Sequence, residues 1–330
     1  MDFAKPVCHH GVMSIHNLIT QFGSEAALEL VGEQDRRLVE LAVHILGDET
    51  GDLGYLYSGF AMTGLPHRRP TNEMAPWKRS NGRYRLLVEP GHMFNARGDV
   101  LPCGMPFGSR ARLILLYLQT EAIRTNSPEV RLGATMHDWL DRMGIPPGGT
   151  SYTAIRDQAR RLSACRLTVG WTAEDGRSGF ERANIVNAMM FVADPGDNRQ
   201  TQLWDETARL SPEFYLALRD HPVPIAEAAI RAIQNSSSVM DIYVWLAYRL
   251  RALDRSTVIS WSALHQQFGP EYKSLKRFKE KFVESLKEAM AVYPGAKVDI
   301  DTRGAVLWPS PPAVPERNGR RSLKLISSSP

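Results

Sequence analysis

The sequence predicts an α+β protein in which one order of helices and short strands occurs twice. A nearly all-apolar run at Ser109–Leu118, long enough for a buried helix, opens the first copy, and Asp241–Leu250 repeats its character. Each run is followed by a short strand, further helices of which the last is basic, and a closing pair of strands. This order is typical of a winged helix-turn-helix, so we expect two such domains in tandem behind an N-terminal helical and loop extension.

Composition limits the class of protein. The 330 residues are 43% hydrophobic and 23% charged, as in an ordinary globular chain of two or three domains. The net charge of +4 only hints at a polyanionic partner. No apolar run approaches the roughly 20 residues that cross a bilayer, and Met1–Asn17 lacks the pattern of a secretory signal. Three scattered cysteines fit a reducing compartment. We therefore expect a soluble cytoplasmic protein.

The N-terminal part offers two features with competing interpretations. Ser24–Leu46 is predicted to be one helix, capped by Ser24 and followed by Gly47. Its apolar residues are spaced almost as a heptad, which favours packing against its own domain over a dimer seam. A group of possible metal ligands comprises Cys8, His9, His10 and His16. It lacks a second ligand pair at structural-zinc spacing, so we expect neither a metal nor another cofactor.

The stretch from Gly47 to Arg110 is rich in loops. Leu65–Pro70 and Ala75–Arg79 are rigid and basic, and suit either contact with a phosphate backbone or wrapping of a domain surface. Gly82–Glu89 and Gly91–Phe94 are predicted to be short strands.

The third helix of the first copy is the predicted DNA-reading element. It follows a strand at Val130–Leu132, a helix at Met136–Met143 and a Pro-Pro-Gly-Gly turn, and is expected over Tyr152–Ala164 with Thr150 or Ser151 as its cap. Ile155, Ala159 and Leu162 form an apolar stripe. Thr153, Arg156, Asp157 and Arg160 lie opposite, and Arg161 lies at the flank. Arginine forks can pair with guanine in the major groove, although a charged helix face is often only solvated.

A wing is expected after this helix. Arg166–Val169 and a returning apolar strand at Asn184–Val192 enclose a loop rich in glycine and arginine, in which Arg177 and Arg182 could contact phosphates. The turn before the helix and this hairpin after it favour DNA binding over a solvated face.

The second copy repeats these elements. It contains a strand at Thr257–Ile259, a helix at Trp261–Phe268, a long helix at about Tyr272–Met290 and a closing hairpin of Lys297–Ile300 with Ala305–Trp308. The long helix carries an apolar stripe of Leu275, Phe278, Phe282, Leu286 and Ala289, with Lys279 beside it. The predicted domains are 1–80, 81–195 and 200–314, followed by a disordered tail at 315–330. The predicted DNA contacts are Ser151, Tyr152, Thr153, Arg156, Arg160, Arg161, Arg177, Arg182, Lys273, Lys276, Arg277 and Lys281.

Several segments together resemble a known family. They are Pro106–Arg112, Gly148–Thr150, His221–Pro224, Asp241–Leu250, Trp261, Gln267–Gly269 and Pro309–Pro312. In this order they resemble the plasmid-encoded RepA-type replication initiators, over roughly Leu65 to Val314. The resemblance implies a protein that binds origin repeats (iterons) in double-stranded DNA, promotes opening of an AT-rich segment and recruits the host initiator and helicase. Dimers of related initiators often repress their own promoter, so a homodimer and a part in plasmid copy control are also implied.

Three other classes of function are open: an enzyme, a transcriptional regulator, and a scaffold protein that only contacts other replication proteins. An enzyme is disfavoured because the chain has no His-hydrophobe-His nicking motif, no Walker loop, no Gly-x-Ser-x-Gly element and no zinc-ligand spacing. A winged-helix transcriptional regulator without initiator activity remains the alternative, since it would use the same domains. Length and the second copy favour the initiator.

Overall fold

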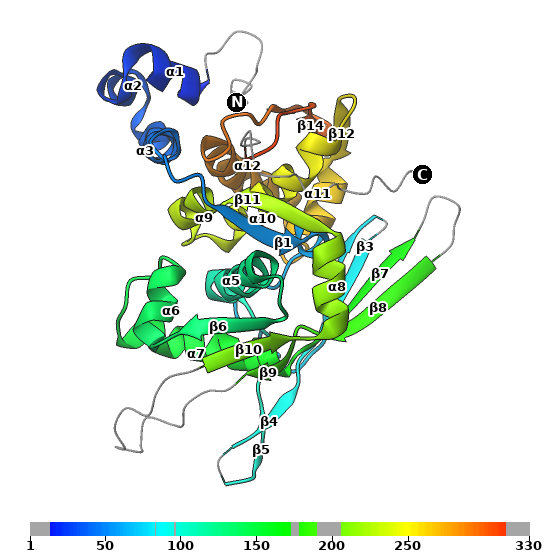
Figure 1. Ribbon diagram of the computed structural model, residues 1–330. Helices are drawn as coiled ribbons and strands as arrows, with labels where there is room; N and C mark the ends of the chain where they lie inside the picture. Colours follow the sequence, from blue (N-terminus) through cyan, green and yellow to red (C-terminus); the bar gives the residue numbers. More distant parts are fainter. Residues whose placement is uncertain (1–13, 83, 96, 173–177, 190–205, 315–330) are drawn as a thin grey trace. The chain divides into compact units, whose positions relative to one another are not determined.

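The computed structural model describes residues 14–82, 84–95, 97–172, 178–189 and 206–314 (Figure 1). The chain forms two compact units. Unit 2 is the continuous stretch Gly54–Pro222, and unit 1 combines Met1–Leu53 with Val223–Pro330. The divisions between the units therefore fall at other places than the domain boundaries expected from the sequence. Helices and strands are mixed in both units, in agreement with the predicted α+β class.

Unit 2 is built around α5 (Gly108–Thr125), which contains the apolar run predicted to be a buried helix. Nearly all side chains in the middle of α5 are buried, including polar ones. Buried polar groups need partners, and these bond to backbone of the preceding segment. Arg112 donates to the carbonyl of Leu65 at 2.7 Å, and the Gln119 side chain accepts the N–H of Tyr57 at 2.7 Å. Polar residues of the helix thus attach the loop-rich segment to the core.

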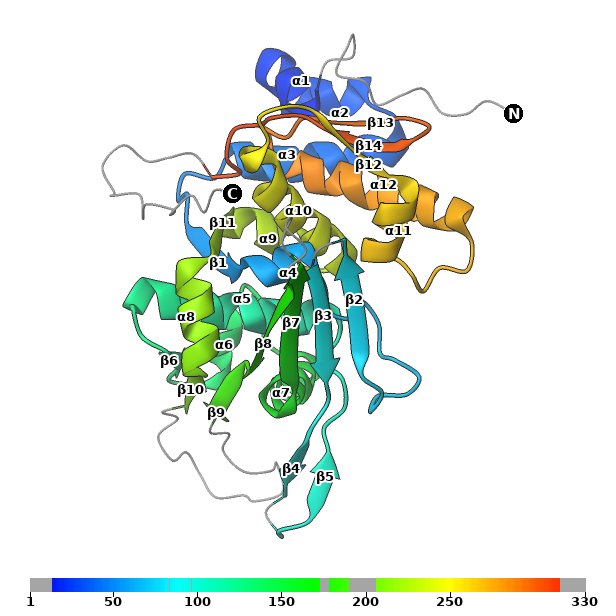
Figure 2. The same ribbon diagram turned by 90° about the vertical axis from the view of Figure 1, so that its right-hand side faces the viewer.

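Unit 2 also contains three small sheets, of which the β4-β5 hairpin projects away from the helices (Figures 1 and 2). The remaining helices are α4 (Ser58–Met62), α6 (Met136–Arg142), α7 (Gly149–Ala164) and α8 (Pro212–Asp220). An antiparallel sheet in the order β2-β3-β7-β8 contains Trp77–Asn81, Tyr84–Glu89, Arg166–Thr172 and Ser178–Asn184. A second, in the order β6-β10-β9, contains Glu129–Gly133, Glu206–Leu210 and Val186–Met189. The third is the hairpin of β4 (His92–Phe94) and β5 (Val100–Pro102).

The returning strand predicted at Asn184–Val192 is divided between two sheets. β8 ends at Asn184 and β9 begins at Val186, while 190–192 lie outside the described residues. The residue between them, Ile185, is fully buried, and its carbonyl accepts the N–H of Ser211 at 3.1 Å. This long-range bond takes the chain out of the hairpin sheet, which local sequence pattern could not reveal.

Unit 1 contains the second set of elements at the predicted positions. They are α10 (Ser237–Arg249), β12 (Thr257–Ser260), α11 (Trp261–Phe268), α12 (Leu275–Ala291), β13 (Val298–Ile300) and β14 (Gly304–Leu307). The three strands form one antiparallel sheet in the order β12-β14-β13. Aromatic rings pack between the helices. The ring centre of Phe268 on α11 lies 5.2 Å from that of Trp245 on α10 and 5.5 Å from that of Phe282 on α12.

The single helix predicted at Ser24–Leu46 is wrong. The structure has α2 (Ser24–Leu30), a 3-10 turn at Glu33–Asp35 and α3 (Arg36–Leu46), after α1 (Ile15–Phe22). The break occurs because Val31 and Gly32 adopt extended backbone, with ψ of 154° and 157°. α3 packs against α12 and α9 (Glu227–Ile233) of the same unit.

The N-terminal helices are therefore part of unit 1 and not a separate extension. Leu38 and Ala42, two of the apolar residues with the predicted heptad-like spacing, are buried on α3. Unit 1 also has a 3-10 turn at Leu250–Ala252, and β1 (Leu53–Tyr57) and β11 (Pro222–Ala226) contain the points at which the chain passes from one unit to the other. Among the residues that the structure describes, no helix is both long and apolar enough to cross a membrane.

Candidate nucleic-acid interface

The helix α7 begins earlier than predicted and is capped differently. It starts at Gly149 with Gly148 as N-cap, and no side chain caps it, so neither Thr150 nor Ser151 has the predicted role. The Gly148 carbonyl instead accepts the N–H of Tyr152 at 2.9 Å. Glycine tolerates the N-cap position at little cost, and the Pro-Pro-Gly-Gly turn therefore leads directly into the helix.

The two predicted faces of α7 are present. Ile155, Ala159 and Leu162 are fully buried against unit 2. On the opposite side Thr153 and Arg160 are exposed, Arg156 is half-buried, and the Thr153 hydroxyl donates to the carbonyl of Gly149 at 3.0 Å. Ser151 and Tyr152 are half-buried in the first turn. An apolar stripe fixes the helix, and Thr153, Arg156 and Arg160 lie on the side away from that stripe.

Arg161, which is predicted from the sequence to contact DNA, lies buried inside unit 2. Its side chain is only 6% exposed and donates to Asp157 at 2.8 Å, to Glu73 and to the carbonyl of Met105 at 3.1 Å. The guanidinium also lies 5.2 Å from the centre of the Phe107 ring. The flank of a helix faces solvent only if nothing packs there, and here Glu73, Met105 and Phe107 contact the Arg161 side chain.

Glu73 receives charge from two sides. Arg69 pairs with it at 2.6 Å, and Arg161 pairs with its second oxygen. Hydrogen bonds from Arg69 and then from Arg161 lower the pKa of the Glu73 carboxyl below its ordinary value, because they stabilise its charged form. Arg69, one of the arginines of the basic segment Leu65–Pro70, is thus engaged in an ion pair with Glu73.

The second predicted basic segment divides similarly. Arg79 is buried, with its guanidinium 4.3 Å from the centre of the Trp77 ring, whereas Lys78 is exposed. Arg79 is therefore packed inside unit 2 and only its neighbour faces solvent. The two cations point to opposite sides because successive residues of a strand alternate between faces.

The predicted wing lies largely outside the described residues. Arg177 belongs to the gap at 173–177. Arg182 is placed only by strand register, aligned with Thr168 of β7. Their contact with phosphates therefore stays a prediction.

The helix α12 resembles the predicted long helix closely. Ser274 caps it by accepting the N–H of Arg277 at 3.4 Å, and the predicted stripe is buried except at Leu275, which is 44% exposed. Leu275 is exposed because it is the first residue of the helix, before the first core contact at Phe278. As predicted, Lys279 lies beside the stripe, with its ammonium 4.9 Å from the centre of the Trp261 ring.

The cations of α12 are partly neutralised by its own acids. Arg277 pairs with Glu280 at 3.5 Å, and Lys281 pairs with Glu284. Such exposed pairs contribute about 0–1 kcal/mol, so a phosphate could replace the acid at little cost. Lys273 and Lys276 are exposed and, within the described part of the chain, have no ion-pair partner. The N-terminal turn of α12 is therefore its most electropositive part.

The candidate metal ligands do not come together. Cys8, His9 and His10 lie outside the described residues, and His16 bonds to the carbonyl of Ala291 at 2.8 Å. Over the described ranges no group of three or more His, Cys, Asp or Glu side chains could hold a metal ion.

Sequence reasoning missed one set of cations, which only strand register brings together. Lys78, Arg85 and Arg166 come from β2, β3 and β7, and all three are exposed. Cross-strand partners in an antiparallel sheet point to the same face. Lys78 aligns with Leu87 and Arg166 with Glu89, which places both on the same face as Arg85.

This architecture defines a protein of mixed helices and strands, and a solved structure shares that fold. The chain is similar to the crystal structure of SeMet derivatives of domain 2 and domain 3 of RctB, with a TM-score of 0.50 and 13% identity, over 79% of this chain and 100% of that chain. A second structure, of the RctB domains 2-3 (RctB-155-483), has a TM-score of 0.45 and 16% identity, over 75% of this chain and 94% of that chain.

The sequence itself matches one family. Residues 105–263, a little under half of the chain, match the family described as plasmid encoded RepA protein. The resemblance to plasmid-encoded RepA-type proteins is thereby confirmed for this stretch, which runs from the start of α5 through α7 to α11. No curated protein matches the chain.

Proposed function

We propose that the protein is a plasmid replication initiator that recognises origin repeats in double-stranded DNA through α7 and α12. The family match and the fold shared with RctB domains support an initiator role. The proposed role is non-catalytic: binding positions the protein at the origin, where it promotes opening of an AT-rich segment and recruits host replication factors.

The observation that carries this proposal is the division of α7 into two faces within the matched region. Thr153, Arg156 and Arg160 project away from the buried stripe of Ile155, Ala159 and Leu162. A helix fixed to its domain by one face can present the other to the major groove, where arginine makes the commonest specific contact with guanine.

We further propose that both basic helices belong to winged helix-turn-helix domains. In unit 1 this is supported by the β12-β14-β13 sheet, which joins the strand before α11 to the hairpin after α12. Unit 2 departs from this pattern. Its hairpin β7-β8 follows α7, but β6 pairs with β10 and the hairpin pairs with β3.

Footprinting of the purified protein on origin DNA, at two protein concentrations, tests the proposal. We expect protection of direct repeats at whole-turn spacing, with Arg156→Ala and Arg160→Ala each losing about 1–3 kcal/mol on the specific site. Arg219→Ala is the matched control, since it removes an exposed arginine of α8 from the same unit.

Two outcomes would contradict the proposal. Equal losses on specific and random duplexes would make both arginines phosphate contacts. Protection without any permanganate-reactive opening, together with no support of plasmid replication in cells, would favour the transcriptional regulator.

A further inference from the structure

Strand register divides the four-stranded sheet of unit 2 into two faces of different chemistry. Leu86 aligns with Val169, and Val88 aligns with Leu167, so these four apolar residues share one face. The residues between them along each strand belong to the other face. A sheet that is apolar on one side and polar on the other normally packs with the apolar side only.

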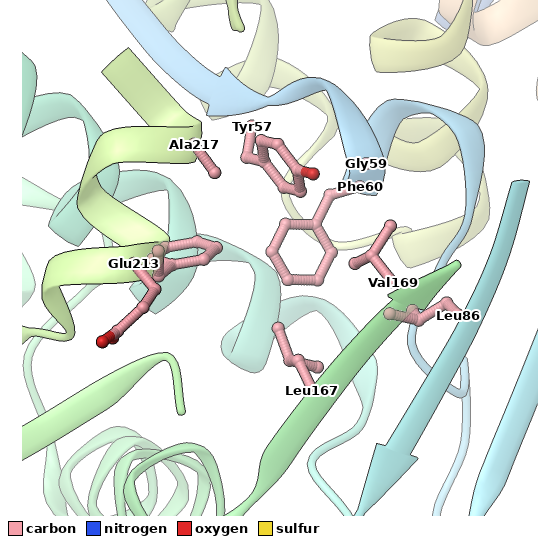
Figure 3. A pocket seen from close by; sticks show the side chains of 9 residues that line it. Tyr57, Gly59, Phe60, Leu86, Leu167, Val169, Glu213 and Ala217 are labelled. Atoms are coloured by element: carbon pink, nitrogen blue, oxygen red, sulfur yellow. The ribbon is translucent and has the colours of Figure 1, made fainter. Parts of the chain in front are cut away.

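The apolar face is covered. Figure 3 shows Leu86, Leu167 and Val169 on one side of a small hollow, with Tyr57 and Phe60 opposite them. The rings of Tyr57, Phe60 and Phe214 meet edge to face, with centres 5.9 to 6.4 Å apart. These rings from β1, α4 and α8 therefore close this side of the sheet.

The other side, here called the outer sheet face, carries four exposed side chains, with half-buried residues between them; the exposed ones are Lys78, Arg85, Arg166 and Phe180. One row across the strands consists of Ser80, Arg85, Gly170 and Phe180, and the next contains Lys78, Leu87 and Thr168. A third row places Glu89 beside Arg166. In Figure 2 no helix of unit 2 crosses β2, β3 and β7 on the side that faces the viewer.

The charge of the outer sheet face is positive. Lys78, Arg85 and Arg166 are exposed, and none has an ion-pair partner among the residues that the structure describes. Glu89 is the one carboxylate that register places on this face among side chains that are described. Three cations against this one carboxylate leave the face with a net positive charge, which attracts a polyanion.

An exposed aromatic ring lies in the same row. Phe180 is 70% exposed although it is a large apolar side chain. Its neighbour in register, Gly170, has no side chain, and the nearest atoms to a Cβ there would be the Gly179 carbonyl oxygen at 3.7 Å and Arg85 Cβ at 3.9 Å. No side chain at Gly170 therefore stands between Arg85 and Phe180 in this row.

This combination favours a single strand over a duplex. The bases of a duplex are stacked inside, and its major groove admits a helix or a two-stranded ribbon but not the face of a four-stranded sheet. Cations that follow a backbone and an aromatic ring that stacks on an unpaired base are the two components of single-strand binding sites. An exposed phenylalanine has no comparable partner on a duplex backbone.

We propose that the outer sheet face binds single-stranded nucleic acid, with Lys78, Arg85 and Arg166 paired to phosphates and Phe180 stacked on a base. This site is separate from the duplex-reading face of α7 and does not depend on it. The proposal thus gives the protein a second nucleic-acid site of a different substrate class.

Fluorescence anisotropy with a labelled oligothymidylate and with a random duplex tests this proposal in the full-length protein. Phe180→Ala should weaken single-strand binding by about 5- to 100-fold, as expected for the loss of one stacked base. Phe180→Trp should retain binding, because tryptophan also stacks. Arg85→Ala should make the log–log salt dependence shallower by about 0.7, the value for one lost phosphate contact on a single strand.

Two controls separate this site from the duplex site. Arg219→Ala should change the affinity for neither nucleic acid. Arg156→Ala should lower the affinity for the specific duplex but not for the oligothymidylate. Unchanged single-strand affinity in both Phe180→Ala and Arg85→Ala would overturn the proposal, as would equal losses on single strand and random duplex. If instead the duplex proposal fails, Arg156→Ala will bind the specific duplex as tightly as the wild type. The single-strand results for Phe180→Ala and Arg85→Ala do not depend on that outcome. Thermal unfolding of each variant verifies that unit 2 remains folded.

Discussion

Replacing Arg161 by methionine should destabilise unit 2 without removing a DNA contact. Arg161 looks from the sequence like a basic residue of the reading helix, but it lies inside the unit with three hydrogen-bond partners. Methionine keeps most of the apolar stem and removes the guanidinium. The carbonyl of Met105 and the carboxylates of Asp157 and Glu73 then lose their donor.

The size of this effect follows from the exposure of the partners. Removing one member of a buried ion pair costs about 3–5 kcal/mol. Because the side chains of Asp157 and Glu73 are 43% and 27% exposed and water can replace part of the interaction, a loss of about 2–3 kcal/mol is expected here. For a unit of this size such a loss lowers Tm by about 5–10 °C.

Urea unfolding followed by circular dichroism measures this loss, with Arg160→Met as the matched control. Arg160 is the next residue and is exposed, so its replacement should change stability by less than about 0.5 kcal/mol. Arg160→Met should weaken binding to the specific duplex, whereas Arg161→Met should leave the affinity of the folded protein unchanged. Unchanged stability of Arg161→Met combined with weaker specific DNA binding would refute the structural role of Arg161.

Three further predictions concern other parts of the chain. Replacing Lys273 and Lys276 together by alanine should reduce the log–log salt slope of duplex binding by about 1.8, and an unchanged slope would exclude the start of α12 from the interface. Burial raises the pKa of the Cys165 thiol to about 12, so iodoacetamide at pH 8 should alkylate Cys165 only after unfolding, as read by peptide mass spectrometry; fast labelling of the folded protein would contradict this. Since the pKa of Glu73 is lowered, its contribution to stability is complete above the unfolded value near 4.5 and is lost as pH falls through the folded value. The unfolding free energy should therefore decrease more steeply in acid for the wild type than for Glu73→Gln, and parallel curves would show that Glu73 contributes nothing.

Elements with strong local patterns could be predicted from the sequence. The buried run of α5 and the two-sided pattern of α7 depend on residues three or four positions apart, which periodicity detects. The same holds for α12 and the hairpin β13-β14, whose predicted limits differ from the observed ones by only a few residues. For α7 the orientation was predictable, and DNA contact at Arg156 and Arg160 stays a prediction.

Long-range pairing set the limit of prediction. The ion pair between Arg161 and Glu73 joins positions 88 residues apart, and a helical wheel contains no information about such a partner. Likewise, the residues of β2 are predicted to lie in a loop-rich stretch and β3 is predicted as an isolated strand, so the alignment of Arg85 with Gly170 cannot be seen from the sequence. The break at Val31-Gly32 was missed because an apolar seam continued through it.

The two-part composition of unit 1 has a consequence for synthesis on the ribosome. α3 emerges early, but α9 and α12, against which its apolar face packs, begin about 180 and 230 residues later. At translation rates of about 5–20 residues per second this delay lasts roughly 10 to 40 seconds. Gly54–Pro222 is continuous and can fold during that interval, whereas the first helices remain without their partners. The nascent chain thus exposes Leu38, Val39 and Ala42 for most of its synthesis, which makes this segment the natural target of a chaperone.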